Sequence, residues 1–212
     1  MKAIVAGATG LVGMNLVKEL LEDETFKEVV VFVRKPFPLE HNKLRVVTGE
    51  LSKISSFTTE LKGDVYFSCL GTTIRIAGSQ ENFRKVDFYG IVSFGRLAFQ
   101  NKAKKFLVVS ANGAHSKSKI FYNRVKGETE KALKDIGFPT LVIYRPGLLV
   151  GNREEKRTGE KLAVESFRIL RHILPEKLNR TIATEVSVLV KHILEDAKSE
   201  SSGLRIVEAK EI

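Results

Sequence analysis

Short apolar runs alternate with amphipathic segments along most of this chain of 212 residues. The apolar runs predict seven β-strands, at 2–6, 29–34, 43–48, 64–69, 105–109, 140–144 and 204–207. Several of them are almost continuous in valine, isoleucine, leucine and phenylalanine, which is typical of parallel strands covered by helices on both faces. The segments between them predict helices at 11–21, 52–61, 80–101, 123–136 and 185–197. This order predicts an α/β fold, a doubly wound (Rossmann) parallel sheet with helices on both faces.

The alternation lapses between residues 150 and 184. Residues 152–159 are polar and predict a loop, and a short helix is predicted at 162–170. Ligands of doubly wound sheets bind beyond the carboxyl ends of the strands, so we expect 150–184 to be a lid on the substrate side. About thirty-five residues are too few for an independent domain. We therefore assign residues 1–212 to a single domain with this insertion.

A glycine-rich sequence directly follows the first predicted strand and precedes the first predicted helix. In that context, glycines let a pyrophosphate approach backbone N–H groups and the positive end of a helix dipole. Thr9, within the turn, either donates to a phosphate or caps the helix. The sequence predicts that the following residues bind a dinucleotide: Gly7, Thr9, Gly10, Leu11, Val12 and Gly13.

The end of the second predicted strand indicates which dinucleotide is bound. Arg34 and Lys35 stand there, where NAD-specific folds commonly place an acidic residue for the ribose 2′-hydroxyl. A guanidinium offers paired donors to a 2′-phosphate, which a carboxylate would repel. Arg34 therefore favours NADP(H) over NAD(H). The alternative is that Arg34 only stacks on the adenine and accepts either cofactor.

The ends of the next two strands are expected to complete the cofactor site. Glu50 and Leu51 follow the third strand and are predicted to border the adenine. The fourth strand leads into Cys69, Leu70, Gly71 and Thr72, where Gly71 lets the backbone pass close to ribose and pyrophosphate. Cys69 is the only cysteine, which excludes an internal disulfide and a cysteine-rich zinc site. We interpret its thiol as a small buried hydrophobe rather than a nucleophile.

Three residues in the second half of the chain form a candidate catalytic set. Tyr122 and Lys126 are four residues apart, so they lie on one face of a helix, where the ammonium can lower the pKa of the phenol. Ser110 ends the fifth predicted strand and can polarise a carbonyl, while Tyr122 passes a proton and Lys126 binds ribose hydroxyls. Each also has an ordinary explanation, as a turn serine, a half-buried aromatic or a surface lysine. Their combination predicts a dehydrogenase or reductase.

Charge does not change this interpretation. Lysine and arginine number 35 against 25 acidic residues, a net charge of +10, but the excess is spread along the chain without a nucleic-acid-binding motif. We interpret it as a solvated surface that also attracts an anionic cofactor.

No apolar stretch approaches the about 20 residues that span a bilayer, and no signal-peptide pattern is present. The four histidines lack metal-ligand spacing. We expect a cytoplasmic protein with a small-molecule substrate and without metal, nucleic-acid or membrane partners.

Three segments resemble the short-chain dehydrogenase/reductase superfamily: GATGLVG at 7–13, SANGAHSKSKIFYNRVK at 110–126 and YRPGLLVG at 144–151. Three further segments narrow the resemblance to an atypical branch of this superfamily: CLGTTIRIAGSQENFRKVDFYG, FYNRVKGETE and RPGLLVGNREEKRTGE. The resemblance implies an NADP(H)-binding fold with Ser110, Tyr122 and Lys126 in catalytic roles. It also implies that Arg145, Pro146 and Gly147 lie beside the cofactor at the substrate end.

Two departures from the superfamily pattern are visible. Many members place an asparagine in the fourth helix to complete a proton relay, whereas this chain has no clear equivalent and carries Asp87 in the nearest matching stretch. The substrate-binding portion is also shorter than in the extended sugar-nucleotide enzymes.

We predict that the protein reduces a small carbonyl compound; the alternative is a non-catalytic NADP(H) sensor. A homodimer is possible if Phe88, Phe94 and Leu97 form an outer face rather than pack inward.

Overall fold

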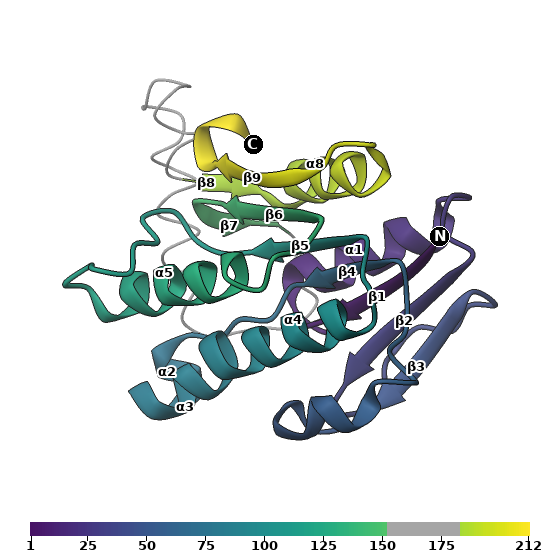
Figure 1. Cartoon of the computed structure of the whole chain (residues 1–212), viewed down its shortest axis with the longest axis horizontal. Helices are drawn as coiled ribbons and strands as arrows, with labels where there is room; N and C mark the ends of the chain where they lie inside the picture. Colours follow the sequence, from purple (N-terminus) through teal and green to yellow (C-terminus); the bar gives the residue numbers. More distant parts are fainter. Residues whose placement is uncertain (152–182) are drawn as a thin grey trace.

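The computed structural model describes residues 1–151 and 183–212. Seven strands form one sheet in the order β3-β2-β1-β4-β5-β6-β9, and every neighbouring pair is parallel (Figure 1). The strands are β1 (Lys2–Ala6), β2 (Glu28–Val33), β3 (Leu44–Thr48), β4 (Val65–Ser68), β5 (Lys105–Val109), β6 (Thr140–Arg145) and β9 (Gly203–Glu208). The predicted doubly wound α/β fold is confirmed. The strand order reverses between β1 and β4, which is where such folds bind their ligands.

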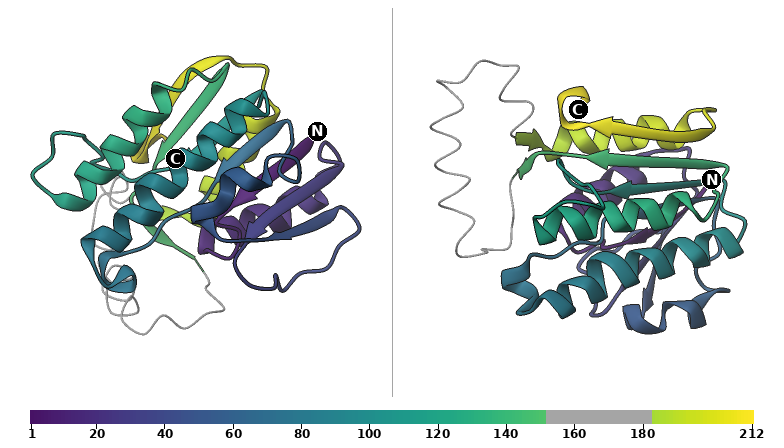
Figure 2. Two further views of the ribbon diagram at one scale, coloured as in Figure 1. Left: turned by 60° about the horizontal axis from the view of Figure 1, so that its bottom comes forward. Right: turned by 60° about the vertical axis from the view of Figure 1, so that its left-hand side comes forward.

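Helices cover both faces of this sheet (Figure 2). On one face lie α1 (Leu11–Glu22) and α8 (Val186–Lys198), and on the other lie η1 (Leu51–Phe57), α4 (Ile91–Gln100) and α5 (Phe121–Lys134). Successive side chains of a strand point to opposite faces. In β4, for example, Phe67 packs in the core beneath α1, whereas Tyr66 packs against Phe94 of α4.

The helix predicted at 80–101 is divided into several segments. It consists of α3 (Gln80–Arg84), a π-helical segment η2 (Lys85–Gly90) and α4, and a further short helix, α2 (Ile74–Ala77), precedes it. Ser79 caps α3 by accepting a hydrogen bond from Asn82 N–H, and Gly78, at φ +77°, ends α2. A π-helical turn adds a residue to the helix, shifts the side chains that follow and frequently marks a functional site. In this chain it contains Asp87.

Two other sequence-based expectations differ from the structure. The helix predicted at 52–61 is a shorter 3₁₀-helix, η1, which begins after Glu50. Strands β7 (Leu148–Val150) and β8 (Ala183–Glu185) were not predicted, and they pair in parallel as a separate two-stranded sheet. They bring together the chain on the two sides of the predicted lid. The lid itself, with its helix at 162–170, lies outside the described residues except at its ends.

The side chains proposed for a dimer face mostly pack inward. Phe94 is fully buried and Leu97 is nearly so, both in the core beneath α4, while Phe88 is half-buried. Packing against the sheet therefore accounts for two of the three residues, and the homodimer stays a prediction. Among the described residues, no helix is long and apolar enough to cross a membrane.

Candidate cofactor and active site

The glycine-rich turn brings three backbone segments together more closely than side chains would permit. Gly7 has φ +83°, and a Cβ there would lie 2.4 Å from the carbonyl carbon of Cys69. A Cβ on Gly13 would lie 2.2 Å from the carbonyl oxygen of Gly7. Helix α1 begins after Gly10, which carries no side-chain cap, so its N-terminus presents backbone N–H groups at the carboxyl edge of the sheet.

The side chains of the remaining residues of this turn differ in their exposure to solvent. Thr9 is exposed and Leu11 is half-buried, so their side chains are available to a ligand. Val12 is buried in the core beneath α1 and therefore serves packing rather than ligand contact. Of the two predicted roles of Thr9, capping is not adopted here, because the N-cap position is Gly10.

Arg34 and Lys35 lie beside this turn. Both are exposed and follow β2 directly, and β2 pairs with β1 up to Ala6, the residue before Gly7. Gly49 N–H donates to the carbonyl oxygen of Val33 at 2.9 Å, which holds the following Glu50 near Arg34. Glu50 is exposed, whereas Leu51 packs against the core. Arg34, Lys35 and Glu50 therefore form an exposed group beside the glycine-rich turn.

Tyr122 and Lys126 lie on one face of α5, as predicted. Tyr122, in the first turn, is half-buried, and its ring centroid is 5.6 Å from that of Phe83. Lys126 is buried, with Nζ 6.0 Å from the centroid of the Tyr122 ring. Burial alone would lower the pKa of Lys126, but the negative charge of Asp87, with smaller contributions from Tyr122 and Glu130, raises it overall. The ammonium therefore stays charged at neutral pH.

Asp87 joins Lys126 to the turn that follows β4. Its side chain is fully buried, and Oδ1 lies 2.7 Å from Lys126 Nζ in an ion pair. The other carboxylate oxygen, Oδ2, accepts a hydrogen bond from the backbone N–H of Thr72 at 2.9 Å. A Cβ on Gly71 would lie 3.7 Å from both Asp87 Oδ1 and Lys126 Nζ. The turn at 70–72 therefore passes directly over the ion pair.

Ser110 belongs to a second network of buried charges. It follows β5, and its hydroxyl donates to Oε1 of Glu130 at 2.5 Å. Arg145 clamps the same carboxylate, with Nε 3.1 Å from Oε1 and Nη2 2.6 Å from Oε2, and reaches Glu208 with Nη1 at 2.8 Å. A serine hydroxyl has one hydrogen, so Ser110 faces its surroundings as a hydrogen-bond acceptor here. The predicted polarisation of a carbonyl by Ser110 would require that hydrogen to leave Glu130.

Glu130 belongs to the site although it was not predicted from the sequence. Glu130 is four residues after Lys126 and eight after Tyr122, so helical spacing alone places all three on one face. The pattern Y-x-x-x-K-x-x-x-E was the available signal. Arg145 was predicted, but its guanidinium is held by two carboxylates, and the hydrogen bonds that it donates to Glu130 raise its pKa.

The predicted residues Cys69, Pro146 and Gly147 act through their backbone. Cys69 N–H donates to Ala6 O at 2.8 Å, and burial raises the pKa of its thiol to about 12, so it is protonated at neutral pH. Pro146 O accepts from Asn112 N–H at 2.9 Å, and Gly147 N–H donates to Thr184 Oγ1 at 3.0 Å. These bonds hold the loop after β5 and the β8 strand at the edge where the catalytic candidates lie.

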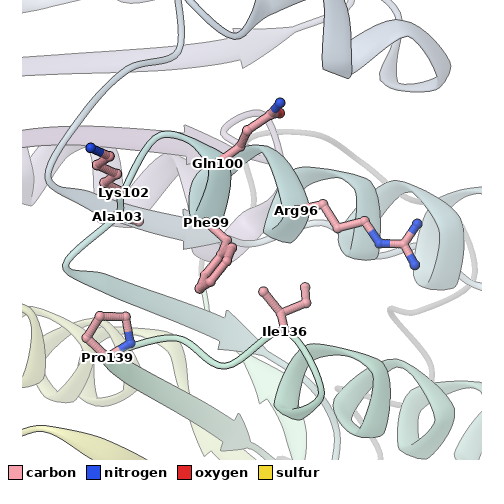
Figure 3. Close-up of a pocket in the computed structure, with 7 residues that line it drawn as sticks. All are labelled: Arg96, Phe99, Gln100, Lys102, Ala103, Ile136 and Pro139. Atoms are coloured by element: carbon pink, nitrogen blue, oxygen red, sulfur yellow. The ribbon is translucent and has the colours of Figure 1, made fainter.

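A surface hollow lies away from these residues. Its volume is about 690 Å³, and it is lined by Arg96, Phe99, Gln100, Lys102, Ala103, Ile136 and Pro139 (Figure 3). Ala103 and Pro139 precede β5 and β6, so the hollow is at the amino edge of the sheet, whereas the candidate catalytic residues are at the carboxyl edge.

Comparison with known families identifies the kind of site. The profile of a family described as NAD(P)H-binding matches residues 7–167, which include the glycine-rich turn and the Ser110, Tyr122 and Lys126 set. The chain belongs to this family. The match agrees with a dinucleotide site at the carboxyl ends of β1 and β4, and it does not distinguish NAD from NADP.

Two named relatives are similar over most of the chain. The chain is 32% identical to Protein HTATIP2 of Rattus norvegicus over 213 residues, covering 98% of this chain and 86% of the rat protein. It is 37% identical to Protein FMP52, mitochondrial, of Candida albicans over 161 residues, covering 73% of this chain and 70% of the fungal protein. Because the fungal relative is described as mitochondrial, the cytoplasmic location stays a prediction.

Solved structures share the fold at low sequence identity. MoeE5 in complex with UDP-glucose and NAD superimposes with a TM-score of 0.74 at 16% identity, covering 98% of this chain and 75% of that one. A UDP-N-acetylglucosamine 4-epimerase from Methanobrevibacter ruminantium gives a TM-score of 0.75 at 16% identity, covering 98% and 76%. These likenesses show that the chain shares its Rossmann fold with these structures.

Proposed function

We propose that this protein is an NADP(H)-dependent oxidoreductase of the short-chain type that reduces a small carbonyl compound. The observation that carries the proposal is Lys126, a buried and charged lysine held beneath the turn at 70–72 and on the same helical face as Tyr122. Burying an ammonium is costly unless a counter-ion compensates it, as Asp87 does here, and this ammonium lies beside a phenol that can transfer a proton.

The residues at the carboxyl edge fit a dinucleotide. Gly7 and Gly13 let the turn pack directly against neighbouring backbone, which places the uncapped N-terminus of α1 at this edge, and such an N-terminus favours a pyrophosphate. Arg34, exposed beside the turn, would pair with a 2′-phosphate, and no acidic residue stands at that position. NADPH would supply a hydride to the carbonyl carbon.

The side chains of Tyr122, Lys126 and Ser110 would carry out the proton transfer. Tyr122 donates its phenol hydrogen to the carbonyl oxygen as that oxygen becomes negative, so the product is an alcohol and the enzyme is left with a phenolate. Lys126 stabilises the phenolate because its raised pKa keeps it charged. Ser110, whose hydrogen is held by Glu130, accepts a hydrogen bond from the phenol or from the alcohol.

One observation favours a second candidate function. Ser110 and Lys126 are already engaged by the carboxylates of Glu130 and Asp87. A protein that binds NADP(H) as a sensor, without turnover, would tolerate such engagement. The two functions differ in whether the Tyr122 hydroxyl is needed.

NADPH oxidation with a panel of aldehydes and ketones tests the proposal. Once a substrate is found, Tyr122→Phe should lower kcat by about 10²–10⁴-fold, because it removes only the proton donor. NADPH affinity should be unchanged. Tyr89→Phe is the matched control, since Tyr89 is 57% exposed, and it should keep full activity. Tight NADPH binding without turnover on any carbonyl would replace the reductase by the sensor.

A further inference from the structure

We propose that Asp87 is a positioning residue that fixes the turn at 70–72 and Lys126 relative to each other for the nicotinamide half of NADPH, and that this position requires a carboxylate. The inference rests on the NADP(H) site proposed above. It concerns a residue in the stretch nearest to the helix where many superfamily members place an asparagine.

Asp87 is attached to three parts of the site at once. Its Oδ2 accepts the Thr72 N–H at 2.9 Å, and its Oδ1 lies 2.7 Å from Lys126 Nζ. Its carbonyl oxygen accepts the hydroxyl of Thr129, a residue of α5, at 2.7 Å. The side chain is fully buried, so water cannot substitute for either carboxylate contact. Asp87 thus links the end of β4, the π-helical segment and the catalytic face of α5.

One carboxylate oxygen accepts a hydrogen bond from the Thr72 N–H and the other lies in an ion pair with the Lys126 ammonium, which determines the residue type. An ionised aspartate offers two acceptor oxygens, whereas asparagine offers one acceptor and one NH₂ donor. In either orientation, an asparagine would direct its NH₂ at a donor, either the Thr72 N–H or the Lys126 ammonium. One of the two partners would then be buried without an acceptor, and the Lys126 charge would lose its counter-ion. An isosteric amide therefore cannot replace the carboxylate in this geometry.

The consequence should be confined to one half of the cofactor. Lys126, which the sequence predicts to bind ribose hydroxyls, lies on α5 after β5, whereas Arg34 follows β2, with β1 and β4 between these two strands. We therefore assign Lys126 to the ribose at the nicotinamide end. Asp87→Asn should weaken binding of NADPH by about tenfold, which corresponds to about 1.4 kcal/mol. Adenosine 2′,5′-bisphosphate carries the adenine, the 2′-phosphate and the 5′-phosphate but no nicotinamide ribose. Its affinity should change by less than about threefold.

Asp64 provides a matched control in the same chain. Its Oδ2 accepts the backbone N–H of Lys2 at 2.8 Å, and its Oδ1 lies 3.4 Å from Lys104 Nζ. The same pair of donors thus faces a carboxylate, but just before β4, at the amino edge of the sheet. Asp64→Asn should leave the affinity for both probes within about twofold of the unmodified protein.

The experiment is a calorimetric titration of NADPH and of adenosine 2′,5′-bisphosphate into the unmodified protein, Asp87→Asn and Asp64→Asn, with thermal unfolding of each. NADPH affinity of Asp87→Asn within twofold of the unmodified protein would overturn the inference, as would equal losses for both probes. If Asp87→Asn does not fold, the double variant Asp87→Asn/Lys126→Met decides. Without the ammonium, the amide oxygen can accept the Thr72 N–H, so the double variant should fold and bind adenosine 2′,5′-bisphosphate normally. A double variant that does not fold would overturn the inference.

The outcome is separable from that of the proposed reaction. Absence of turnover on every carbonyl would remove the reductase, but it would leave these affinities and their interpretation intact. Failure of the unmodified protein to bind NADPH would overturn both.

Discussion

The two halves of the candidate site are built by opposite means. The glycine-rich turn consists of backbone, and its geometry depends on side chains that are absent at Gly7 and Gly13. The face of α5 consists of charged side chains, each held by another charge, as in the Lys126–Asp87 and Arg145–Glu130 pairs. In the first half, close backbone approach at the glycines positions the N-terminus of α1. In the second, reactivity comes from groups whose charge states are held by their neighbours.

The difference indicates how each half should respond to substitution. A backbone site is damaged when atoms are added, because the neighbouring main chain cannot move away. A network of buried charges is damaged when one partner is neutralised, because the other remains buried without compensation. Four substitutions, ordered from the largest expected effect to the smallest, test this contrast.

Neutralising Glu130 should have the largest effect on stability. Glu130→Gln leaves one acceptor for the donors of Ser110 and Arg145, and removing one partner of a buried ion pair costs about 3–5 kcal/mol. Arg145 keeps Glu208, so we expect the lower end of that range, with a fall in Tm of about 6–12 °C. Glu128→Gln, on the same helix and paired with partly exposed Arg84, should lower Tm by no more than about 4 °C. Thermal unfolding measures both, and equal shifts would contradict the network.

Adding one methyl group to Gly13 tests the backbone half. The Cβ would lie 2.2 Å from Gly7 O and 2.9 Å from Ala8 Cα, both of them backbone atoms, so α1 must shift away from the turn. Overpacking of this kind costs about 1–3 kcal/mol. We expect Gly13→Ala to lower Tm and to weaken NADPH binding in the same preparation. Gly10→Ala meets only Gly7 O, at 3.3 Å, and should be less harmful in unfolding measurements; equal harm would argue against close approach as the cause.

A substitution of Arg34 tests the adenine end of the site. There, an exposed charge is proposed to select the cofactor, and no buried network is involved. Arg34→Ala should weaken NADPH binding by about tenfold, or about 1.4 kcal/mol. NADH affinity, measured in the same titrations, should hardly change because NADH lacks the 2′-phosphate. Equal affinities of the unmodified protein for the two cofactors would remove the NADP preference and leave only stacking on adenine.

Asp23 tests a charge outside both halves, at the far end of α1. A hydrogen bond from Lys198, supported by Thr25, lowers the pKa of Asp23 to about 2. The folded protein therefore binds this proton less readily than the unfolded chain, and the stabilisation is present above the ordinary pKa of 3.8 and lost as pH falls towards 2. Lys198 is 42% exposed, which limits the effect to about 1 kcal/mol or less.

Thermal unfolding between pH 7 and pH 2 measures this effect. Asp23→Asn should lower Tm by about 2–4 °C at pH 7 and by nothing near pH 2. Asp135→Asn, at an exposed position after α5, is the control and should show no such pH dependence. A constant difference across the pH range would contradict the ionic origin.

Much of the fold could be predicted from local pattern. Apolar runs located all seven strands of the main sheet, because parallel strands buried on both faces leave an almost continuous hydrophobic signal. The strands β7 and β8 were missed because three residues each are too short to show a period. The short helix α2 was missed because four residues are too few to show a helical period, and the π-helical segment was missed because the hydrophobic pattern continues across it.

The chemical identity of the site was likewise determined by the sequence only in part. Glycine spacing, Arg34 and the Tyr122–Lys126 interval are local features, and helical or turn geometry fixes their consequences. The partners of the reactive groups are not local. Asp87 meets Lys126 because η2 packs on α5, and Arg145 meets Glu130 because β6 ends beside that helix. The sequence by itself determined which reactive groups this protein has. Only the tertiary structure decided which charges hold them, because burial and distance between separate elements set the pairing of charges.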